Sequence, residues 1–175
     1  DDNLDKIELY NYNDKTTTII ENGTVLTEEG IYKITATDKA GNKTIVYVEI
    51  DKTAPSITGF EDGSYTNKNE IVYVQDSSLY KVTINGEEYE HHGKYFEKKF
   101  THEGTYTVVA KDQAGNTTTK TVTIDKTAPV FEDLKNGIYY QNDIIVNVTD
   151  DHLDKITAKV YATNEEIELE NGSKL

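Results

Sequence analysis

The chain has 175 residues, no cysteine and a formal net charge of -14, from 32 acidic and 18 basic side chains. The negative charge argues against nucleic acid and anionic membrane surfaces as partners, because both bind basic faces. The lack of cysteine excludes disulfides and thiolate chemistry. No apolar run approaches the roughly 18 residues of a membrane-spanning helix, so we expect no membrane insertion.

Short stretches of sequence recur every 74 or 75 residues along the whole chain. GIYKITATDKAGN begins at Gly30 and GTYTVVAKDQAGN at Gly104, and DKTAP begins at Asp51 and again at Asp125. A fixed period of this kind is the sequence signature of repeated modules. We therefore predict three modules: an incomplete one at 1–53 that lacks its first strands, a complete one at 54–127, and the N-terminal half of a third at 128–175.

The first repeat is predicted to contain two strands joined by a tight turn. Apolar residues occupy every second position of these strands: Tyr32, Ile34, Ala36, Val46, Val48 and Ile50. Alternation with period two is typical of strands with one buried face. In the AGN turn between them, Gly41 supplies a positive φ and Asp38 accepts backbone N–H groups. Asp112 and Gly115 form the same turn one repeat later.

The pentapeptide DKTAP contains the only two prolines of the chain, Pro55 and Pro129. Proline fixes φ and lacks an N–H group, so it stiffens a joint and stops strand pairing from running through it. We therefore interpret DKTAP as the junction between one module and the next.

The complete repeat is predicted to contain seven short strands and no helix. We place them near 56–60, 70–75, 80–84, 88–91, 95–100, 105–111 and 117–125. Short strands separated by turns at this spacing are typical of a β-sandwich. The core residues predicted from their alternation are Val72, Val74, Val82, Ile84, Tyr106, Val108, Ala110, Val122 and Ile124.

The third repeat stops midway, and a half sandwich leaves apolar faces and strand edges open. Residues 130–149 supply the two strands that the first repeat lacks. Either the missing parts lie beyond the termini, or the tail of one molecule completes the head of another. The second arrangement is intermolecular strand complementation, which would build a non-closing chain of molecules.

Two stretches, EEGIYKI at residues 28–34 and HEGTYTV at 102–108, resemble the Asp-x-Gly-x-Tyr-x-Cys stretch of immunoglobulin folds. The resemblance implies that the Tyr32 and Tyr106 hydroxyls close a corner between two strands. The longer pattern GxYxxxAxDxAGN, followed by DKTAP, resembles the tandem bacterial Ig-like domains of Gram-positive cell-surface and secreted proteins. The fold class that we expect is all-β: tandem immunoglobulin-like β-sandwich modules of about seven strands, without disulfides.

The resemblance also implies a function. It indicates a non-catalytic repeat segment (a spacer, stalk or adhesin rod) of a bacterial cell-surface or secreted protein, whose first partners are the neighbouring modules of its own chain. All basic residues are lysine, which indicates an AT-rich bacterial genome. We expect a Gram-positive bacterium and a secreted or cell wall-attached, extracellular protein.

The alternative is a carbohydrate- or host-protein-binding module that is accessory to an enzyme or adhesin. The HHGKYF stretch at residues 91–96 does not match the other repeats, and aromatic rings beside polar groups can stack on sugar rings. Tyr10, Tyr12 and Tyr161 form no obvious common site. The competing interpretation is that tyrosine, being amphipathic, fills the edge strands of a small sandwich.

Catalysis has little support in the sequence. No HExxH, GxSxG or P-loop spacing occurs, and His91–His92 and His102 are expected at opposite ends of one strand. We therefore expect no enzyme activity, no catalytic residue and no organic cofactor. A Lys–Asn isopeptide crosslink needs a buried lysine, and Lys120 is the one candidate on the predicted inward faces.

Carboxylates are predicted to converge at both junctions, because the linker, the loop after the second strand and the hairpin after the sixth lie at one end of a module. The two groups are Asp51, Asp76 and Asp112, and Asp125, Asp150 and Asp151. Ca²⁺ takes about 6–8 oxygen ligands and suits such loops. The competing interpretation is that these aspartates form turns while Lys52 and Lys126 neutralise them.

Overall fold

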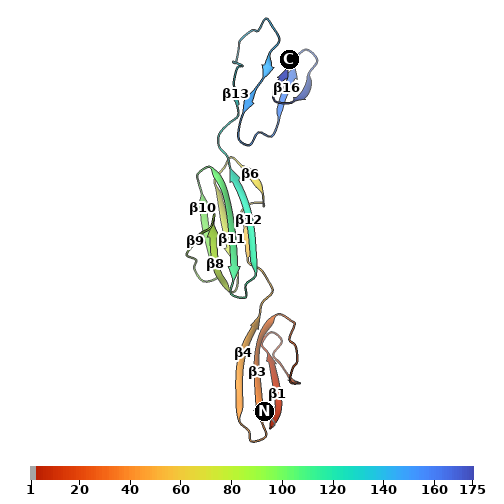
Figure 1. Cartoon of the computed structure of the whole chain (residues 1–175), viewed down its shortest axis with the longest axis vertical. Helices are drawn as coiled ribbons and strands as arrows, with labels where there is room; N and C mark the ends of the chain where they lie inside the picture. The colour runs from red at the N-terminus through yellow and green to blue at the C-terminus, as the bar shows by residue number, and fades with distance from the viewer. Residues whose placement is uncertain (1–2) are drawn as a thin grey trace. The chain divides into compact units, whose positions relative to one another are not determined.

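The structure is a computed structural model that describes residues 3–175, and these residues form strands and turns without a helix (Figure 1). The described residues accordingly contain no helix that could cross a membrane. The chain divides into two compact units, and the division passes through strands of the middle repeat. The first unit comprises Asp1–Gly59, Val72–Lys98 and Thr107–Lys120, and the second comprises Phe60–Ile71, Lys99–Tyr106 and Thr121–Leu175.

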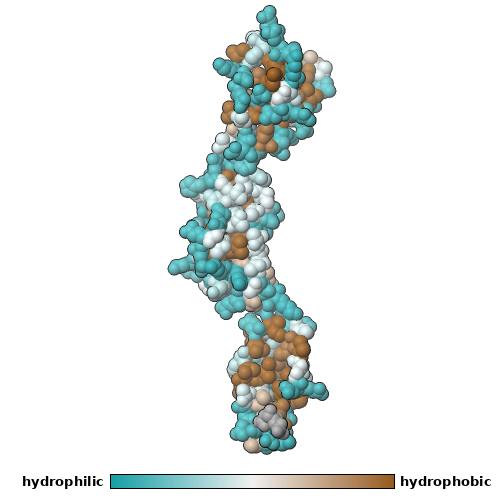
Figure 2. All heavy atoms as spheres, in the orientation of Figure 1, coloured by the Kyte–Doolittle hydropathy of each residue, from teal (hydrophilic) through white to brown (hydrophobic). Residues whose placement is uncertain are grey.

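The first repeat forms one antiparallel sheet in the order β2-β1-β3-β4. Its strands are β1 (Leu4–Asn11), β2 (Thr16–Ile20), β3 (Gly30–Asp38) and β4 (Lys43–Ile50). Leu9 pairs with Ile34, and Tyr32 pairs with Val48, so apolar side chains share one face across three strands. Figure 2 shows hydrophobic residues gathered over this part of the chain.

The middle repeat contains eight strands in two sheets, of order β10-β7-β5 and β6-β12-β11-β8-β9. The strands are β5 (Ser56–Thr58), β6 (Ser64–Thr66), β7 (Glu70–Gln75), β8 (Leu79–Ile84), β9 (Glu87–Tyr89), β10 (Tyr95–Phe100), β11 (Gly104–Asp112) and β12 (Thr117–Ile124). Their alternate apolar residues are buried, which confirms the all-β sandwich fold. The buried set includes Ile57, Val72, Val74, Val82, Ile84, Phe96, Val108, Ala110, Val122 and Ile124.

Strand β6 was not predicted from the sequence. Its three residues pair in parallel with the end of β12, from Val122 to Ile124. The Asp62 carboxylate accepts the Thr121 N–H at 2.7 Å, just before this pairing begins. The sequence Ser-Tyr-Thr is too short to show a period, so the strand exists because of its partner and not because of a local pattern.

The third repeat forms three two-stranded sheets, β13-β15, β14-β18 and β16-β17. The strands are β13 (Val130–Phe131), β14 (Ile145–Val146), β15 (Val148–Thr149), β16 (Ile156–Val160), β17 (Glu165–Leu169) and β18 (Ser173–Lys174). Val146, Val148 and Ile156 are buried together and form a small core. This repeat therefore buries far fewer large side chains than the middle one.

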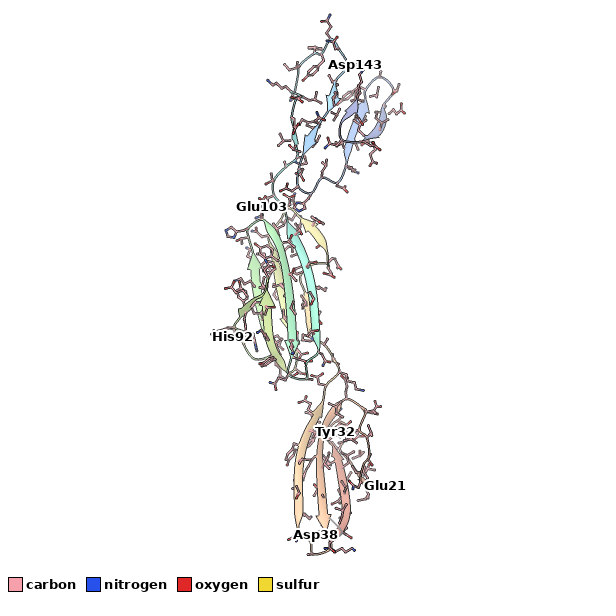
Figure 3. All side chains as sticks on the ribbon, in the orientation of Figure 1. Glu21, Tyr32, Asp38, His92, Glu103 and Asp143 are labelled. Atoms are coloured by element: carbon pink, nitrogen blue, oxygen red, sulfur yellow. The ribbon has the colours of Figure 1, made fainter. Side chains whose placement is uncertain are left out.

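A tyrosine closes a corner at the start of β3 and again at the start of β11. The Tyr32 hydroxyl donates to the Glu28 carbonyl at 2.9 Å, and the Tyr106 hydroxyl donates to the His102 carbonyl at 3.0 Å. A hydrogen bond of this kind fixes the turn that leads into the strand. Figure 3 labels Tyr32 and Asp38, which lie near the two ends of β3.

Candidate functional site

The first DKTAP segment is held by Glu29, the residue just before β3. The Glu29 carboxylate accepts the Lys52 backbone N–H, and it accepts the Thr53 hydroxyl at 3.0 Å. Asp51 accepts the Thr53 N–H at 3.1 Å, which closes a local turn. The linker is therefore attached by its backbone and hydroxyl groups to the repeat that precedes it.

The second DKTAP segment is held in the same way, 74 residues later. Glu103 accepts the Lys126 N–H at 2.6 Å and the Thr127 hydroxyl at 3.0 Å. Asp125 accepts the Thr127 N–H at 3.0 Å. The Lys126 ammonium donates to Asn69 Oδ1 at 2.8 Å, so this lysine contacts neutral oxygens. We call the glutamate together with the Lys and Thr of its linker the linker latch.

The structure brings Asp51, Asp76 and Asp112 together, with one carboxylate oxygen of each within 4.8 Å of the others. Asp112 is fully buried. Its oxygens accept the Gly115 N–H at 2.6 Å, the Asn116 N–H at 2.8 Å and the Asn116 side-chain amide at 2.7 Å. These three donors satisfy the carboxylate, so its contacts are those of a turn-forming residue.

The other two carboxylates of this group share a hydroxyl donor. The Ser78 hydroxyl lies 2.9 Å from Asp51 Oδ2 and 3.2 Å from Asp76 Oδ1, and the Ser78 N–H donates to Asp76 at 2.7 Å. A cation there would compete with this hydroxyl, and would still need most of its ligands from water or backbone carbonyls. Calcium binding by these residues stays a prediction.

At the second junction a histidine occupies the place of the serine. His152 Nδ1 lies 2.8 Å from Asp125 Oδ2, and the His152 N–H donates to Asp150 at 2.8 Å. Asp151 is exposed. Among residues 3–175, the only group of three acidic or histidine side chains close enough to share an ion is the one at the first junction.

Sequence reasoning missed the roles of Ser78 and His152. Ser78 and His152 follow Asp76 and Asp150 by two residues, and each contacts the aspartate of the DKTAP segment before it. The signal was available, because the two residues are 74 positions apart in the same register. Serine and histidine differ chemically, however, so residue type alone did not reveal that the two positions are equivalent.

The AGN turns have the geometry that their sequence requires. Gly41 and Gly115 have φ of 89° and 100°, a region that favours glycine. Asp38 accepts the Ala40 and Asn42 N–H groups at 2.9 and 2.8 Å. The Asn42 side-chain amide, which also donates to Asp38, is the main cause that lowers the pKa of this carboxyl below 3.8.

The remaining sequence candidates lie apart from one another. Pro55 is fully buried, whereas Pro129 is exposed. Lys120 is half-buried on β12. Tyr10 on β1 contacts Tyr12, in the turn after β1, edge to face with ring centroids 4.8 Å apart. Tyr161 is 92% exposed in the third repeat.

A hollow on the middle repeat is lined by four residues of the HHGKYF stretch (His91, His92, Tyr95 and Phe96), together with residues of the strands β5 and β7. Its volume is about 550 Å³, within the range of about 300–1,000 Å³ that is usual for small-molecule sites. The aromatic and imidazole residues on its outer side are Tyr73, Tyr95, His91 and His92, whereas Phe96, which also lines it, is only 8% exposed. Four of the six HHGKYF residues therefore line one concave surface.

The family model described as "Glucodextranase, domain B" matches residues 54–128. The middle repeat is similar to that domain. The domain is Ig-like or fibronectin-like and accessory, not catalytic, so the middle repeat resembles a bacterial Ig-like accessory domain. No curated protein matched the chain significantly in sequence.

Two solved structures were also matched. The fibronectin(III)-like modules of Clostridium thermocellum CbhA are 19% identical, with 70% of this chain and 77% of that chain covered and a TM-score of 0.28. Bacteroides ovatus mixed-linkage glucan utilization locus SGBP-B, solved with a mixed-linkage heptasaccharide, is 16% identical, with 99% of this chain covered and a TM-score of 0.27. The chain spans 59% of the length of SGBP-B.

Proposed function

We propose that this chain is a non-catalytic segment of tandem Ig-like modules that serves as a spacer, stalk or adhesin rod. The parent protein is secreted or attached to the cell wall of a Gram-positive bacterium. The observation that carries the proposal is the linker latch, since the same glutamate contact holds the DKTAP segment after two successive repeats. A linker that is attached in this way has less freedom to bend than a free chain.

Replacing the two latch glutamates tests the proposal. The double variant Glu29→Gln, Glu103→Gln keeps an oxygen acceptor but removes the charge from both contacts, and charge-assisted hydrogen bonds are about twice as strong as neutral ones. We expect larger amplitude motion between repeats, measured by ¹⁵N relaxation and by small-angle scattering. Glu28→Gln is the matched control, because in the described part of the chain its side chain accepts the neighbouring Thr27 hydroxyl at 3.3 Å instead of a linker group. Equal mobility of the double variant and the wild type would contradict a stiffening role.

A second candidate function is an accessory carbohydrate- or host-protein-binding module. The middle repeat resembles a domain that is named as part of a glucodextranase, and it carries the aromatic hollow. These two observations favour a glycan over a host protein as the ligand. Binding of soluble glucan oligosaccharides by the chain tests this function directly.

Intermolecular strand complementation is a further partner proposal. Val48 of the first sheet is 37% exposed, whereas Val122, its counterpart 74 residues later, is 1% exposed. The difference arises because Val122 belongs to a repeat with two sheets, while the described residues of the first repeat form one. Residues 130–149 of a second copy are the proposed cover. Sedimentation at high concentration should then show oligomers, and a monomer would contradict the proposal.

A further inference from the structure

The hollow on the middle repeat lies on the outer face of the three-stranded sheet β10-β7-β5. Side chains alternate between the two faces of a strand. Ile57, Val74 and Phe96 point into the core and are buried. Their neighbours in sequence therefore point outward and line the hollow: Ser56, Thr58, Tyr73, Gln75, Tyr95 and Glu97.

The HHGKYF stretch forms one wall of this hollow. The His92 N–H donates to the Tyr95 carbonyl at 2.9 Å and the Tyr95 N–H donates back at 3.2 Å, so the chain reverses tightly around Gly93. His91 holds the turn in place, because its ring nitrogens lie 2.9 Å from the Gly93 carbonyl and 3.0 Å from the Tyr80 carbonyl. Figure 3 labels His92 on this turn. The wall is thus a fixed part of the repeat.

Two aromatic rings in the hollow are open to solvent. Tyr73 is 44% exposed and Tyr95 is 58% exposed. Exposed aromatic rings that gather in a concave surface mark binding sites more often than single exposed residues do. An aromatic face packs against the C–H face of a pyranose ring, while amide, hydroxyl and carboxylate groups bond its hydroxyls.

The polar groups of the hollow are suited to a neutral ligand. Gln75 can donate and accept, Glu97 accepts, and Ser56 and Thr58 can do both. None of the described residues that line the hollow is a lysine, and the carboxylates there would repel phosphate or an acidic sugar. The side chains therefore match a neutral sugar better than an anion.

The third repeat shows that the fold does not require these residues. Tyr73 corresponds to Asn147, 74 positions later. Val82 pairs with Tyr89, whereas its counterpart Ile156 pairs with Leu169, so the fixed offset does not continue past these hairpins. Strand β18 pairs with β14 as β10 pairs with β7, and its residues Ser173 and Lys174 carry no aromatic ring. The third repeat thus lacks both rings at these strand positions, so the aromatic pair belongs to the middle repeat.

We propose that this hollow binds a short neutral oligosaccharide, with Tyr73 and Tyr95 stacking on sugar rings and Gln75 and Glu97 bonding the hydroxyls. The inference rests on the second function proposed above and does not depend on the spacer function. The linker latch uses none of these residues. A negative result for sugar binding therefore leaves the spacer function untouched, and a negative result for the latch leaves the sugar site untouched.

The test is a titration of the full chain with maltotetraose, isomaltotetraose, cellotetraose and chitotetraose. Calorimetry measures the binding of each sugar, and tyrosine fluorescence, which sums over 13 tyrosines in this chain without tryptophan, is a second readout. We expect at least one sugar to bind with a dissociation constant of about 1 mM or tighter. Tyr73→Ala and Tyr95→Ala should each weaken that binding about tenfold or more, whereas Tyr73→Phe, which keeps the ring, should retain most of it.

The matched control is Tyr47→Ala, which removes a strand tyrosine that is 65% exposed but lies in the first repeat. Thermal melting of every variant checks that the fold is intact. If a sugar binds but the Tyr73 and Tyr95 variants bind it equally well, the site is wrong while the binding function stands. If none of the four sugars binds even when its concentration is about ten times the expected dissociation constant, the oligosaccharide proposal is overturned.

Discussion

Asp112 is a fully buried carboxylate, and the three N–H donors around it explain why it can be buried. A buried charge without partners would cost several kcal/mol, but one that accepts several hydrogen bonds does not carry that cost. Asp38 makes comparable bonds in the first repeat, where it is half-buried. At the scale of single residues, the turn and the acidic group at the junction therefore depend on the same side chain.

The variant Asp112→Asn should destabilise the middle repeat by about 1–3 kcal/mol, because an amide cannot accept the Asn116 amide and the two N–H groups together. Chemical denaturation measures the change, and Asp151→Asn, an exposed aspartate, is the control. The loss should be the same with Ca²⁺ and with a chelator. A loss that occurs only when Ca²⁺ is present would show that the residue acts as a metal ligand instead.

Asp38 should make the stability of the first turn depend on acid pH. Its pKa is lower in the fold than its ordinary value of 3.8, chiefly because Asn42 donates a side-chain hydrogen bond to it. A lowered pKa contributes stability that is present above pH 3.8 and is lost as the pH falls through the folded value. Carboxyl NMR shifts of Asp38 should titrate below pH 3.8, and Asn42→Ala should move the midpoint upward. A midpoint that does not move would contradict this cause.

At the scale of elements, the tyrosine corners and the linker latches lie at the same end of β3 and β11. Tyr106 also stacks face to face on Phe100, with ring centroids 4.2 Å apart. The corner thus has a polar part, the hydroxyl bond, and an apolar part, the ring contact. These two parts can be separated by mutation.

Tyr106→Phe should destabilise the middle repeat by about 0.5–1.5 kcal/mol, the usual net value of one hydrogen bond, because the ring stacking is retained. Tyr106→Ala should cost several times more, since it removes both contacts and leaves a gap beside Phe100. Urea denaturation gives both values, with Tyr47→Phe as the control. Equal effects of the two Tyr106 variants would mean that the hydroxyl alone holds the corner.

The strands and the core followed from the sequence because period-two alternation marks a buried strand face locally. Val72, Val82, Val108 and Val122 were all predicted in this way and are buried. The latch was not predicted, because Glu29 and Lys52 lie 23 residues apart and their contact depends on where the linker turns back. Of the residues that line the hollow, only those in HHGKYF were singled out from the sequence. Tyr73 lies on another strand and joins them through the pairing of separate strands.

At the scale of the whole molecule, the three repeats differ in how completely they bury their own apolar residues. The middle repeat buries ten or more large side chains, whereas the third buries Val146, Val148 and Ile156. Apolar burial is the main source of stability in small domains. The middle repeat should therefore be the most stable part of the chain.

Residues 54–128 expressed alone should unfold in a single cooperative transition, whereas residues 3–50 alone should not, because their one sheet leaves Val46 and Val48 exposed. Circular dichroism during thermal melting and hydrogen exchange would show the difference. Cooperative unfolding of the isolated first segment as a monomer would contradict this expectation, and would also count against strand complementation.

The linker latch has a consequence for how such repeats can be copied or exchanged. Glu29 and Glu103 each hold the Lys and Thr that follow the last strand of their own repeat. A segment that is duplicated or transferred to another protein therefore has to carry its DKT tripeptide with it, or the glutamate is left without its donors. The segment that must be copied as a whole therefore ends after Thr53 or Thr127, several residues beyond the last strand.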